Sequence, residues 1–451
     1  RDLLFSPFQS KREGWKQLEA MTGLQPVKES LRRLLATAAL EGRRRQQGLE
    51  VHPVCRSLAF SGPPGTGKSV TARLAAQILR EEGCGTGRFV EAGREQLIGT
   101  YLGETSPKIA ALFQRARGGV LFIDEAGALL DGGQDIYAVE AVNALEISRL
   151  NLYPDPECRA LRQKLADFYG VKAENVFLAN GSDELLNFFF LAFCDEERTV
   201  AYPAISYGFY PVYASLYRLP AAAIPLREGF RLESGDYCGI GKNVVIANPN
   251  APTGRAISVS EIEEIVRSNP DRAVLIDEAY IDFGGESCLP LVGKYDNLLV
   301  CQTFSKFRSL AGGRLGFAIG SPALIEDLEK IKYSTNSYNI NRLTMAAAIA
   351  TIENNDYYAE NSRRIQENRA YTAGELEKLD FETLPSQANF IFTRCRRMEG
   401  GALYRALKAR GVLVRHWEKP EIADWCRVTI GSREQMDVFL EKVREILKEV
   451  D

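Results

Sequence analysis

Short apolar runs alternate along this chain with longer stretches in which apolar residues recur at helical spacing. The short runs predict buried strands, which we place at 57–61, 120–126, 175–179, 244–247 and 273–276. The periodic stretches predict helices, which we place at 24–40, 70–80, 157–169 and 185–193. Strands that alternate with helices indicate an α/β fold built on mainly parallel sheets.

Composition adds little to this picture but argues against several classes of protein. The 451 residues are enough for two or three domains. The net charge of −3 gives no electrostatic case for nucleic acid, no apolar run is as long as a membrane span, and no signal-peptide pattern opens the sequence. Nine cysteines without C-x-x-C pairs and only two histidines, His52 and His416, argue against zinc sites and a disulfide framework. We therefore expect a cytoplasmic protein.

One stretch, residues 302–317, carries candidate covalent chemistry. It reads Q-T-F-S-K-F-R-S-L-A-G-G-R-L-G-F and places Lys306 between the hydroxyls of Thr303 and Ser305, with Arg314 further on. An amine that is desolvated, or held near another cation, loses its proton near neutral pH and attacks carbonyls. Hydroxyls and an arginine bind a phosphate ester. The combination suggests pyridoxal phosphate on Lys306; the alternative is a surface lysine in a basic, glycine-containing loop.

Two segments upstream favour the cofactor interpretation. N-P-N-A-P-T-G stands at 248–254 after a predicted strand, and I-D-E-A-Y at 276–280 begins where another predicted strand ends. With 302–317, in this order and spacing, they resemble the fold-type I aminotransferases, most closely the histidinol-phosphate aminotransferase group. The resemblance runs from about residue 150 to the C-terminus. It implies pyridoxal 5'-phosphate, a large α/β domain with a mainly parallel sheet, and a small α+β domain.

The resemblance also implies a role for each matching residue around the cofactor. Lys306 would carry the cofactor as a Schiff base and move protons, and Asp277 would pair with the pyridine nitrogen. Tyr280 would bind the 3'-oxygen, and Tyr207 would stack on the ring. The phosphate would lie among Ser182, Asp183, Thr303, Ser305 and Arg314. Taken alone, the Asn-Gly-Ser-Asp-Glu segment at 180–184 is also a helix N-cap signature.

Two features depart from the family pattern. The family more often has asparagine immediately before P-T-G, where it binds the cofactor 3'-oxygen, and this chain has Ala251 there. Asn250 is the neighbouring candidate for that hydrogen bond. The N-terminal arm, whose N-E-N-P-Y-type segment carries a tyrosine to the partner subunit's phosphate site, is not found in the sequence. We nevertheless expect a homodimer formed through the aminotransferase part.

Three residues in the C-terminal part match family positions that meet the substrate: Asn389, Arg415 and Arg427. Arg427 would clamp the substrate's anionic end with two hydrogen bonds, and Arg415 would bind phosphate or the co-substrate carboxylate. A solvated strand end is the alternative for Arg415. The reaction implied is transfer of an amino group from histidinol phosphate to 2-oxoglutarate, in histidine biosynthesis. Threonine-phosphate decarboxylase shares nearly all these motifs, and phenylalanine or tyrosine are further candidate donors.

A different chemistry stands near the N-terminus, where G-P-P-G-T-G-K-S follows a predicted strand and opens a predicted helix. This is a complete P-loop, formed by Gly62, Pro63, Pro64, Gly65, Thr66, Gly67, Lys68 and Ser69. Lys68 would reach the β- and γ-phosphates of ATP, and Ser69 would bind Mg²⁺. At the end of the 120–126 run, Asp124 would hold the Mg²⁺ shell and Glu125 would polarise the attacking water.

This N-terminal part resembles the AAA+ ATPases, in the group with rubisco activases and stage V sporulation protein K. Tyr101 matches the aromatic residue of the family's substrate-gripping pore loop; a packed loop aromatic is the alternative. The sensor asparagine, the arginine finger and the helical lid cannot be found. A predicted helix at 135–150 begins like the AAA+ helix and ends like the helix before the aminotransferase Y-P-D-P segment.

We therefore predict a fusion of two incomplete parts. A truncated P-loop unit would occupy residues 1–145, the cofactor-binding large domain residues 146–330, and the connecting helix with the small domain residues 331–451. From a different class, the competing interpretation is an ATP-driven remodeller of protein partners.

Overall fold

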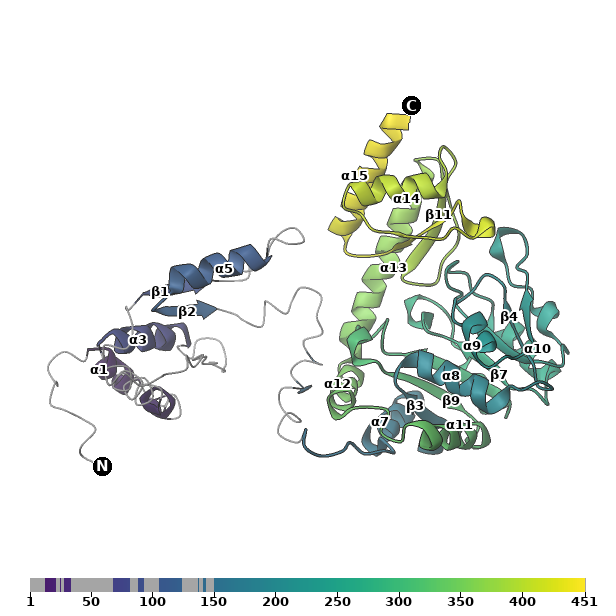
Figure 1. Cartoon of the computed structure of the whole chain (residues 1–451), viewed down its shortest axis with the longest axis horizontal. Coiled ribbons are helices and arrows are strands. Elements are labelled where there is room, and N and C mark those ends of the chain that lie inside the picture. Colours follow the sequence, from purple (N-terminus) through teal and green to yellow (C-terminus); the bar gives the residue numbers. More distant parts are fainter. Residues whose placement is uncertain are drawn as a thin grey trace. The chain divides into compact units, whose positions relative to one another are not determined.

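The computed structural model describes residues 13–21, 25, 28–33, 68–81, 88–92, 105–123, 137, 141–142 and 150–450. The chain divides into two compact units, Arg1–Ile136 and Tyr137–Asp451 (Figure 1). Within the described ranges, none of the helices combines the length and the apolarity that a membrane span requires.

The first unit contains a short parallel sheet with helices packed near it. Its described elements are α1 (Glu13–Ala20), α3 (Lys68–Glu81), β1 (Phe89–Ala92), α5 (Thr105–Ala116) and β2 (Val120–Ile123). Strands β1 and β2 pair in parallel, with Val90 opposite Leu121. Leu18 of α1 and Ile78 of α3 are fully buried in one small apolar cluster. A helix and a strand thus form where the apolar periodicity of 70–80 and the apolar run of 120–126 predict them.

The predicted nucleotide site lies mostly outside the described residues. Lys68 and Ser69 are the first two residues of α3, as a P-loop followed directly by a helix requires. Residues 62–67, Tyr101, Asp124 and Glu125 are outside the described ranges, as are the predicted strand at 57–61 and most of the predicted helix at 135–150.

The second unit is built on a large mixed sheet of seven described strands. Their order across the sheet is β3-β9-β8-β7-β6-β4-β5, and only β9 runs antiparallel to its neighbours. The strands are β3 (Val176–Ala179), β4 (Val200–Pro203), β5 (Ala221–Ile224), β6 (Asn243–Ala247), β7 (Val274–Asp277), β8 (Leu298–Thr303) and β9 (Gly316–Gly320). Every residue of β3, β6, β7 and β8 is buried, which explains their continuous apolar runs.

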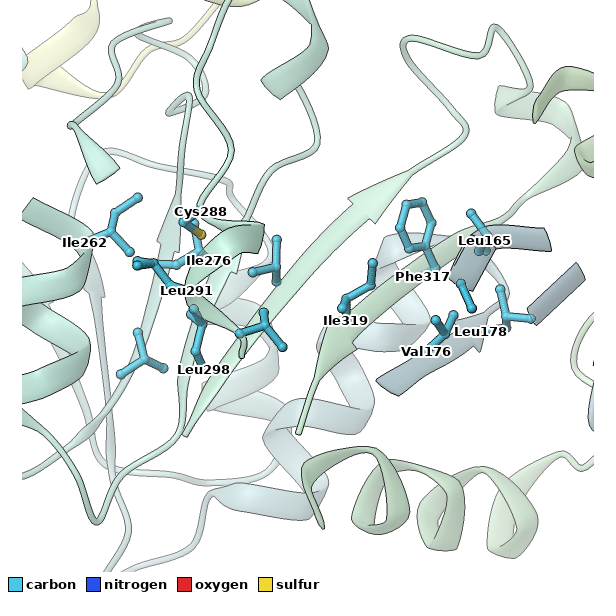
Figure 2. Close-up of a cluster of buried hydrophobic side chains, with 14 of the residues drawn as sticks. Leu165, Val176, Leu178, Ile262, Ile276, Cys288, Leu291, Leu298, Phe317 and Ile319 are labelled. Carbon is cyan, nitrogen blue, oxygen red and sulfur yellow. The ribbon is translucent and has the colours of Figure 1, made fainter. Parts of the chain in front are cut away.

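Helices cover both faces of this sheet and form two separate cores (Figure 1). The helices are α7 (Arg159–Tyr169), α8 (Gly181–Phe193), α9 (Tyr210–Leu216), α10 (Val259–Ser268), α11 (Pro322–Thr335) and α12 (Arg342–Glu353). On one face, Leu165 of α7 and Ile262 of α10 pack with strand residues such as Ile276 and Phe317 (Figure 2). On the other face, the phenylalanines of α8 pack with α9 and α11. The unit is therefore an α/β/α sandwich.

A smaller antiparallel sheet with its own apolar core follows the long helix α13 (Asn355–Glu377), which reaches from α12 to this sheet (Figure 1). Its strand order is β10-β11-β13-β12. The elements are β10 (Phe381–Thr383), β11 (Phe390–Cys395), α14 (Gly400–Ala409), β12 (Arg415–His416), β13 (Cys426–Thr429) and α15 (Arg433–Val450). The α/β fold with a mainly parallel large sheet and a small α+β part is confirmed.

Short 3-10 turns connect many of these elements in the second unit. They lie at Ala173–Asn175, Glu228–Phe230, Ser234–Tyr237, Ile281–Phe283, Leu289–Leu291, Ala311–Gly313 and Pro420–Ile422. Two X-Pro bonds in the 248–254 loop, Asn248–Pro249 and Ala251–Pro252, are cis.

Two glycines allow β9 to pass against the first turn of α8. A Cβ atom on Gly316 would lie 2.4 Å from the backbone nitrogen of Ser182. Gly181 has φ +82°, and a Cβ there would lie 2.6 Å from Nη2 of Arg314. Larger residues at these positions would displace backbone or the Arg314 guanidinium, so the position of the α8 N-terminus depends on both glycines.

Gly316→Ala should therefore lower the free energy of unfolding by about 1–3 kcal/mol, because the added methyl group overlaps backbone atoms that cannot move aside freely. The measurement is equilibrium urea unfolding, with Gly312→Ala as control because a Cβ on Gly312 meets nothing within 4 Å. Equal stability of the two variants would show that β9 and α8 are not in close contact.

Candidate active site

A cavity of about 90 Å³ opens where the carboxyl ends of β6, β7 and β8 meet the N-terminus of α8. Because these three strands are parallel neighbours, the segments that follow them are brought to one edge of the sheet. The cavity is lined by Ser182, Asp183, Tyr207, Ala247, Pro249, Ala251, Asp277, Ala279, Tyr280, Thr303, Ser305, Lys306 and Arg314. Every predicted cofactor-binding residue except Asn250 is in this set.

Asp277, the last residue of β7, provides a buried carboxyl group with 5% of its surface exposed. Burial raises its pKa to about 6, although the Tyr210 hydroxyl, the Ala279 amide and the nearby Lys306 all act to lower it. Tyr210 donates to Oδ2 at 2.9 Å, and the amide of Ala279 donates to Oδ1 at 3.2 Å. A carboxylate desolvated to this extent is stabilised by any cation that binds beside it.

Tyr210 is a site residue that the sequence analysis does not identify. It is fully buried, and burial followed by the charge of Asp277 raises its pKa far above the usual range for tyrosine, so it is a neutral donor. The sequence feature that could have pointed to it is its position three residues after Tyr207, another predicted site residue. At that spacing the two rings meet edge to face, with centroids 5.7 Å apart.

Lys306 lies in the turn that follows β8, with its side chain directed at the same cavity. Its Nζ atom lies 5.3 Å from the centre of the Tyr280 ring, which places the amine over an aromatic face. The turn is ordered by Thr303, whose Oγ1 accepts from the Ser305 amide at 3.1 Å and donates to the Leu315 carbonyl at 3.2 Å. Lys306 is thus half-buried, with its amine near both Tyr280 and Asp277.

The first turn of α8 forms the other end of the cavity. Its N-cap is Asn180, whose side chain makes no capping bond, so Ser182 and Asp183 lie within the helix and not at its cap. The carboxylate of Asp183 accepts from Tyr207 at 2.6 Å and from Arg314 at 2.8 Å. Since that carboxylate is already paired, Asp183 can contact an anion only through its backbone amide. Helix N-terminal amides with a nearby arginine are suited to a phosphate group.

Asn250 faces away from this cavity. Its amide donates to the Ile205 carbonyl at 3.0 Å and to Oγ1 of Thr253 at 3.0 Å, and its side-chain oxygen accepts from Ser206 at 2.7 Å. The neighbouring Ala251 lines the cavity instead. The hydrogen bond from Asn250 to the cofactor therefore stays a prediction, and the amide is engaged in ordering the loop.

Arg427 on β13 lies close to Tyr280 and forms no ion pair with a carboxylate of the described residues. Its guanidinium lies 4.9 Å from the Phe390 ring and 5.7 Å from the Trp417 ring, and its Nε atom is buried without a hydrogen-bond partner. Burial lowers its pKa, Tyr280 acts to raise it, and Arg415 lowers it further. A half-buried guanidinium with an unbonded, buried Nε is costly unless an anion pairs with it.

The other two predicted substrate residues flank Arg427. Arg415 stands directly opposite Arg427 in the β12–β13 pairing and is exposed, with its guanidinium 5.3 Å from the Trp417 ring. Asn389 is half-buried, and its backbone carbonyl accepts from the Ile430 amide at 2.9 Å, one residue beyond β13. The three residues thus lie on or directly beside three neighbouring strands of the small sheet, β11, β13 and β12.

This arrangement can hold a flat cationic ring with an anionic tail. Asp277 suits a protonated ring nitrogen, Tyr207 presents an aromatic face, the α8 turn suits a phosphate, and Lys306 can attack a carbonyl carbon. A family model described as aminotransferase class I and II matches residues 125–443. The chain belongs to this family.

Curated relatives and solved structures agree with this membership. The chain is 45% identical over 312 residues to the histidinol-phosphate aminotransferase of Clostridium botulinum strain 657, covering 69% of this chain and 88% of the relative. It is 47% identical over 309 residues to histidinol-phosphate aminotransferase 1 of Bradyrhizobium diazoefficiens, covering 68% of this chain and 88% of the relative.

Solved structures share the fold. The histidinol-phosphate aminotransferase of Clostridium acetobutylicum matches with a TM-score of 0.64 at 24% identity, over 69% of this chain and 95% of that chain. The Sinorhizobium meliloti enzyme in complex with pyridoxal-5'-phosphate matches with a TM-score of 0.62 at 22% identity, over 69% of this chain and 87% of that chain.

The protein is accordingly a pyridoxal-phosphate-dependent aminotransferase of fold type I, with amino acids and keto acids as its class of substrates. The residues present fit this cofactor. Among the described residues, Asp277 has hydrogen bonds only from the neutral donors Tyr210 and Ala279, which leaves its charge for a ring nitrogen. Glycine at 316 leaves the Ser182 amide of the α8 turn uncovered, and glycine at 181 leaves room for the Arg314 guanidinium beside that turn.

A second family model, ATPase family associated with various cellular activities, matches residues 58–147. The two matched ranges overlap at residues 125–147. This overlap includes part of the segment at 135–150 that the sequence analysis interprets as a helix shared by the two parts.

The raised pKa of Asp277 predicts a pH dependence for the cofactor-free protein. A folded-state pKa near 6, against a usual value of 3.8, means that the folded chain keeps a proton that the unfolded chain releases. This contribution to stability is complete below pH 4 and is lost as the pH rises through 6, by about 1.4 kcal/mol per pH unit in between. Asp277→Asn cannot titrate there.

Urea unfolding of both cofactor-free proteins gives the free energy of unfolding of the parent minus that of Asp277→Asn. This difference should decrease from pH 4 to pH 6 and stay constant above pH 7. A difference that rises with pH over this interval would mean that the Asp277 carboxylate is already paired with a cation in the cofactor-free protein.

Proposed function

We propose that this enzyme transfers the amino group of histidinol phosphate to 2-oxoglutarate, giving imidazole acetol phosphate and glutamate, as a step of histidine biosynthesis. The observation that carries the proposal is the buried, unpartnered Nε of Arg427 with Arg415 beside it. Histidinol phosphate has a phosphate group that two arginines can bind, and 2-oxoglutarate has two carboxylates that they can bind in turn. The names of the relatives that are about 45% identical support the same substrate.

In this proposal each cavity residue has one task. Lys306 would hold the cofactor covalently and, once freed, remove the proton from the substrate's α-carbon through Nζ. Asp277, oriented by Tyr210, would keep the ring nitrogen protonated, and Tyr280 would bind the 3'-oxygen. Ser182, Asp183, Thr303, Ser305 and Arg314 would hold the phosphate. When bound, pyridoxal phosphate supplies an electron sink for the charge that develops at the α-carbon.

A second candidate is decarboxylation of threonine phosphate on the same site. An L-threonine-O-3-phosphate decarboxylase from Porphyromonas gingivalis has the same fold, with a TM-score of 0.60 at 20% identity. Its substrate also combines an amine with a phosphate ester, so the arginine pair suits both molecules. The product distinguishes the two candidates, since only decarboxylation releases carbon dioxide.

With the cofactor-loaded enzyme, histidinol phosphate should convert the bound cofactor at least about a hundredfold faster than aspartate or alanine does. Stopped-flow absorbance measures the rate of this conversion. Arg427→Gln should lose most of this preference, because it lacks the guanidinium proposed to bind the anionic end. Arg394→Gln is the matched control, since Arg394 on the adjacent strand β11 is paired with Glu382.

Lys306→Ala should show no conversion, and borohydride reduction of the parent should place the cofactor on Lys306. Alanine reacting as fast as histidinol phosphate, or carbon dioxide released from threonine phosphate, would contradict the proposed substrate.

We further propose that the aminotransferase part forms a homodimer and comprises the large and small domains at 146–330 and 331–451. Helix α9 supports the dimer because Phe209, Val212 and Leu216 expose 48%, 48% and 63% of their surfaces along one side of it. Exposed apolar residues at helical spacing are typical of a subunit interface. Sedimentation velocity measures the mass, and a monomer at micromolar concentration would contradict the proposal.

For the first unit we propose weak nucleotide binding without sustained hydrolysis. Lys68, Ser69 and Asp124 would meet the phosphates and Mg²⁺, and the match at 58–147 supports this. Hydrolysis also needs an arginine finger, which is worth about 10³–10⁵ in rate in related enzymes, and none is found in the sequence.

ATP should therefore bind to the parent more tightly than to Lys68→Ala, while steady-state phosphate release stays the same in both. Isothermal titration and a phosphate assay measure these two quantities. Lys68-dependent turnover near about one per second would show a complete ATPase site.

A further inference from the structure

A second cavity of about 160 Å³ lies on the opposite side of the loop 248–254 from the active site. Alternate loop residues face the two cavities: Asn248 and Asn250 line this one, whereas Pro249 and Ala251 line the active site. The other residues of its wall are Leu226, Phe230, Arg231, Leu232, Glu233, Ile246, Ala247, Arg255, Ala256, Ile257 and Glu261. None of the predicted cofactor or substrate contacts other than Asn250 belongs to it.

Two arginines in this cavity have no partner of opposite charge. Among the described residues, no carboxylate oxygen lies within 4.0 Å of the guanidinium of Arg231 or of Arg255. Nε of Arg255 is buried and makes no hydrogen bond. Burial lowers the pKa of Arg255, and the charge of Arg231 lowers it further, so the two cations are close enough to repel each other. An anion between them would remove both costs.

The cavity's own carboxylates do not fill this role. Glu261 is engaged in capping helix α10, where its Oε2 accepts from the Ser258 amide at 2.7 Å and from the Ser258 hydroxyl at 2.6 Å. Glu233 is exposed to solvent and forms no ion pair among the described residues. The charge of the two arginines therefore remains available to a ligand.

Part of the wall is apolar, beside the polar side chains of Asn248 and Asn250, and this distinguishes the cavity from a site for a bare ion. The apolar part consists mainly of Leu226, Phe230, Leu232, Ile246 and Ile257. Phe230 is fixed by edge-on contacts with Phe392 and Trp425, at centroid distances of 5.8 and 5.3 Å. The volume exceeds by about tenfold the space that one water molecule needs, which leaves room for a short carbon chain.

We propose that this cavity binds a short dicarboxylate, with one carboxylate on Arg255, the other on Arg231, and the carbon chain against the apolar wall. Arginine binds a carboxylate through two parallel hydrogen bonds, so two arginines match the two ends of such a molecule. Inorganic phosphate would satisfy the charge but make no use of the apolar residues, and a monocarboxylate would leave one arginine unpaired.

Succinate binding to the cofactor-loaded full chain tests the site by isothermal titration. The measurement uses the Arg427→Gln background, which lacks one of the two arginines proposed for the substrate. Succinate should still bind. Adding either Arg255→Gln or Arg231→Gln should raise its dissociation constant by at least about tenfold. The matched control is Arg227→Gln, because Arg227 lies on the same segment but is paired with Asp236 outside the cavity.

The site is overturned if no succinate binds in the Arg427→Gln background, or if Arg255→Gln and Arg231→Gln bind it as tightly as Arg227→Gln. Phosphate or propionate binding as tightly as succinate would overturn the dicarboxylate assignment. Arg231 is exposed, so Arg231→Gln leaves packing intact and decides the test even where thermal unfolding shows that Arg255→Gln is misfolded.

Discussion

The active site depends on one carboxylate held away from water. Asp277 ends a fully buried strand in the middle of the large sheet, between apolar layers that lower the local dielectric constant. Ionising it there costs free energy until a cation binds, and Tyr210 and the Ala279 amide offset only part of that cost. The cavity is thus prepared for a positively charged ring before any ligand arrives. The neighbouring strands then place an amine, an aromatic face and helix amides around that ring.

Much of this could be predicted from the sequence because the chemistry stands next to the strands. The apolar runs before 248–254, 276–280 and 302–317 form β6, β7 and β8, which are parallel neighbours. Residues that directly follow parallel neighbours must meet at one edge of a sheet. Local pattern and resemblance together therefore identify every cavity-lining residue that has a polar or charged side chain.

What could not be predicted depends on contacts between distant segments or on the direction of a side chain. Tyr210 reaches Asp277 across 67 positions of sequence, and no spacing rule relates the two residues. The orientation of Asn250 follows from its bonds to Ile205 and Ser206. The unpaired state of Arg427 arises from packing against Phe390 and Trp417, and burial of that kind is a property of the assembled sheet.

The loop 248–254 separates the two cavities and contributes side chains to both. Because its residues alternate between the cavities, a substitution at 249 or 251 alters one chamber, whereas a substitution at 248 or 250 alters the other. Its composition can vary on each side independently. Its length is more constrained, since inserting or deleting one residue would change which side chains face each cavity.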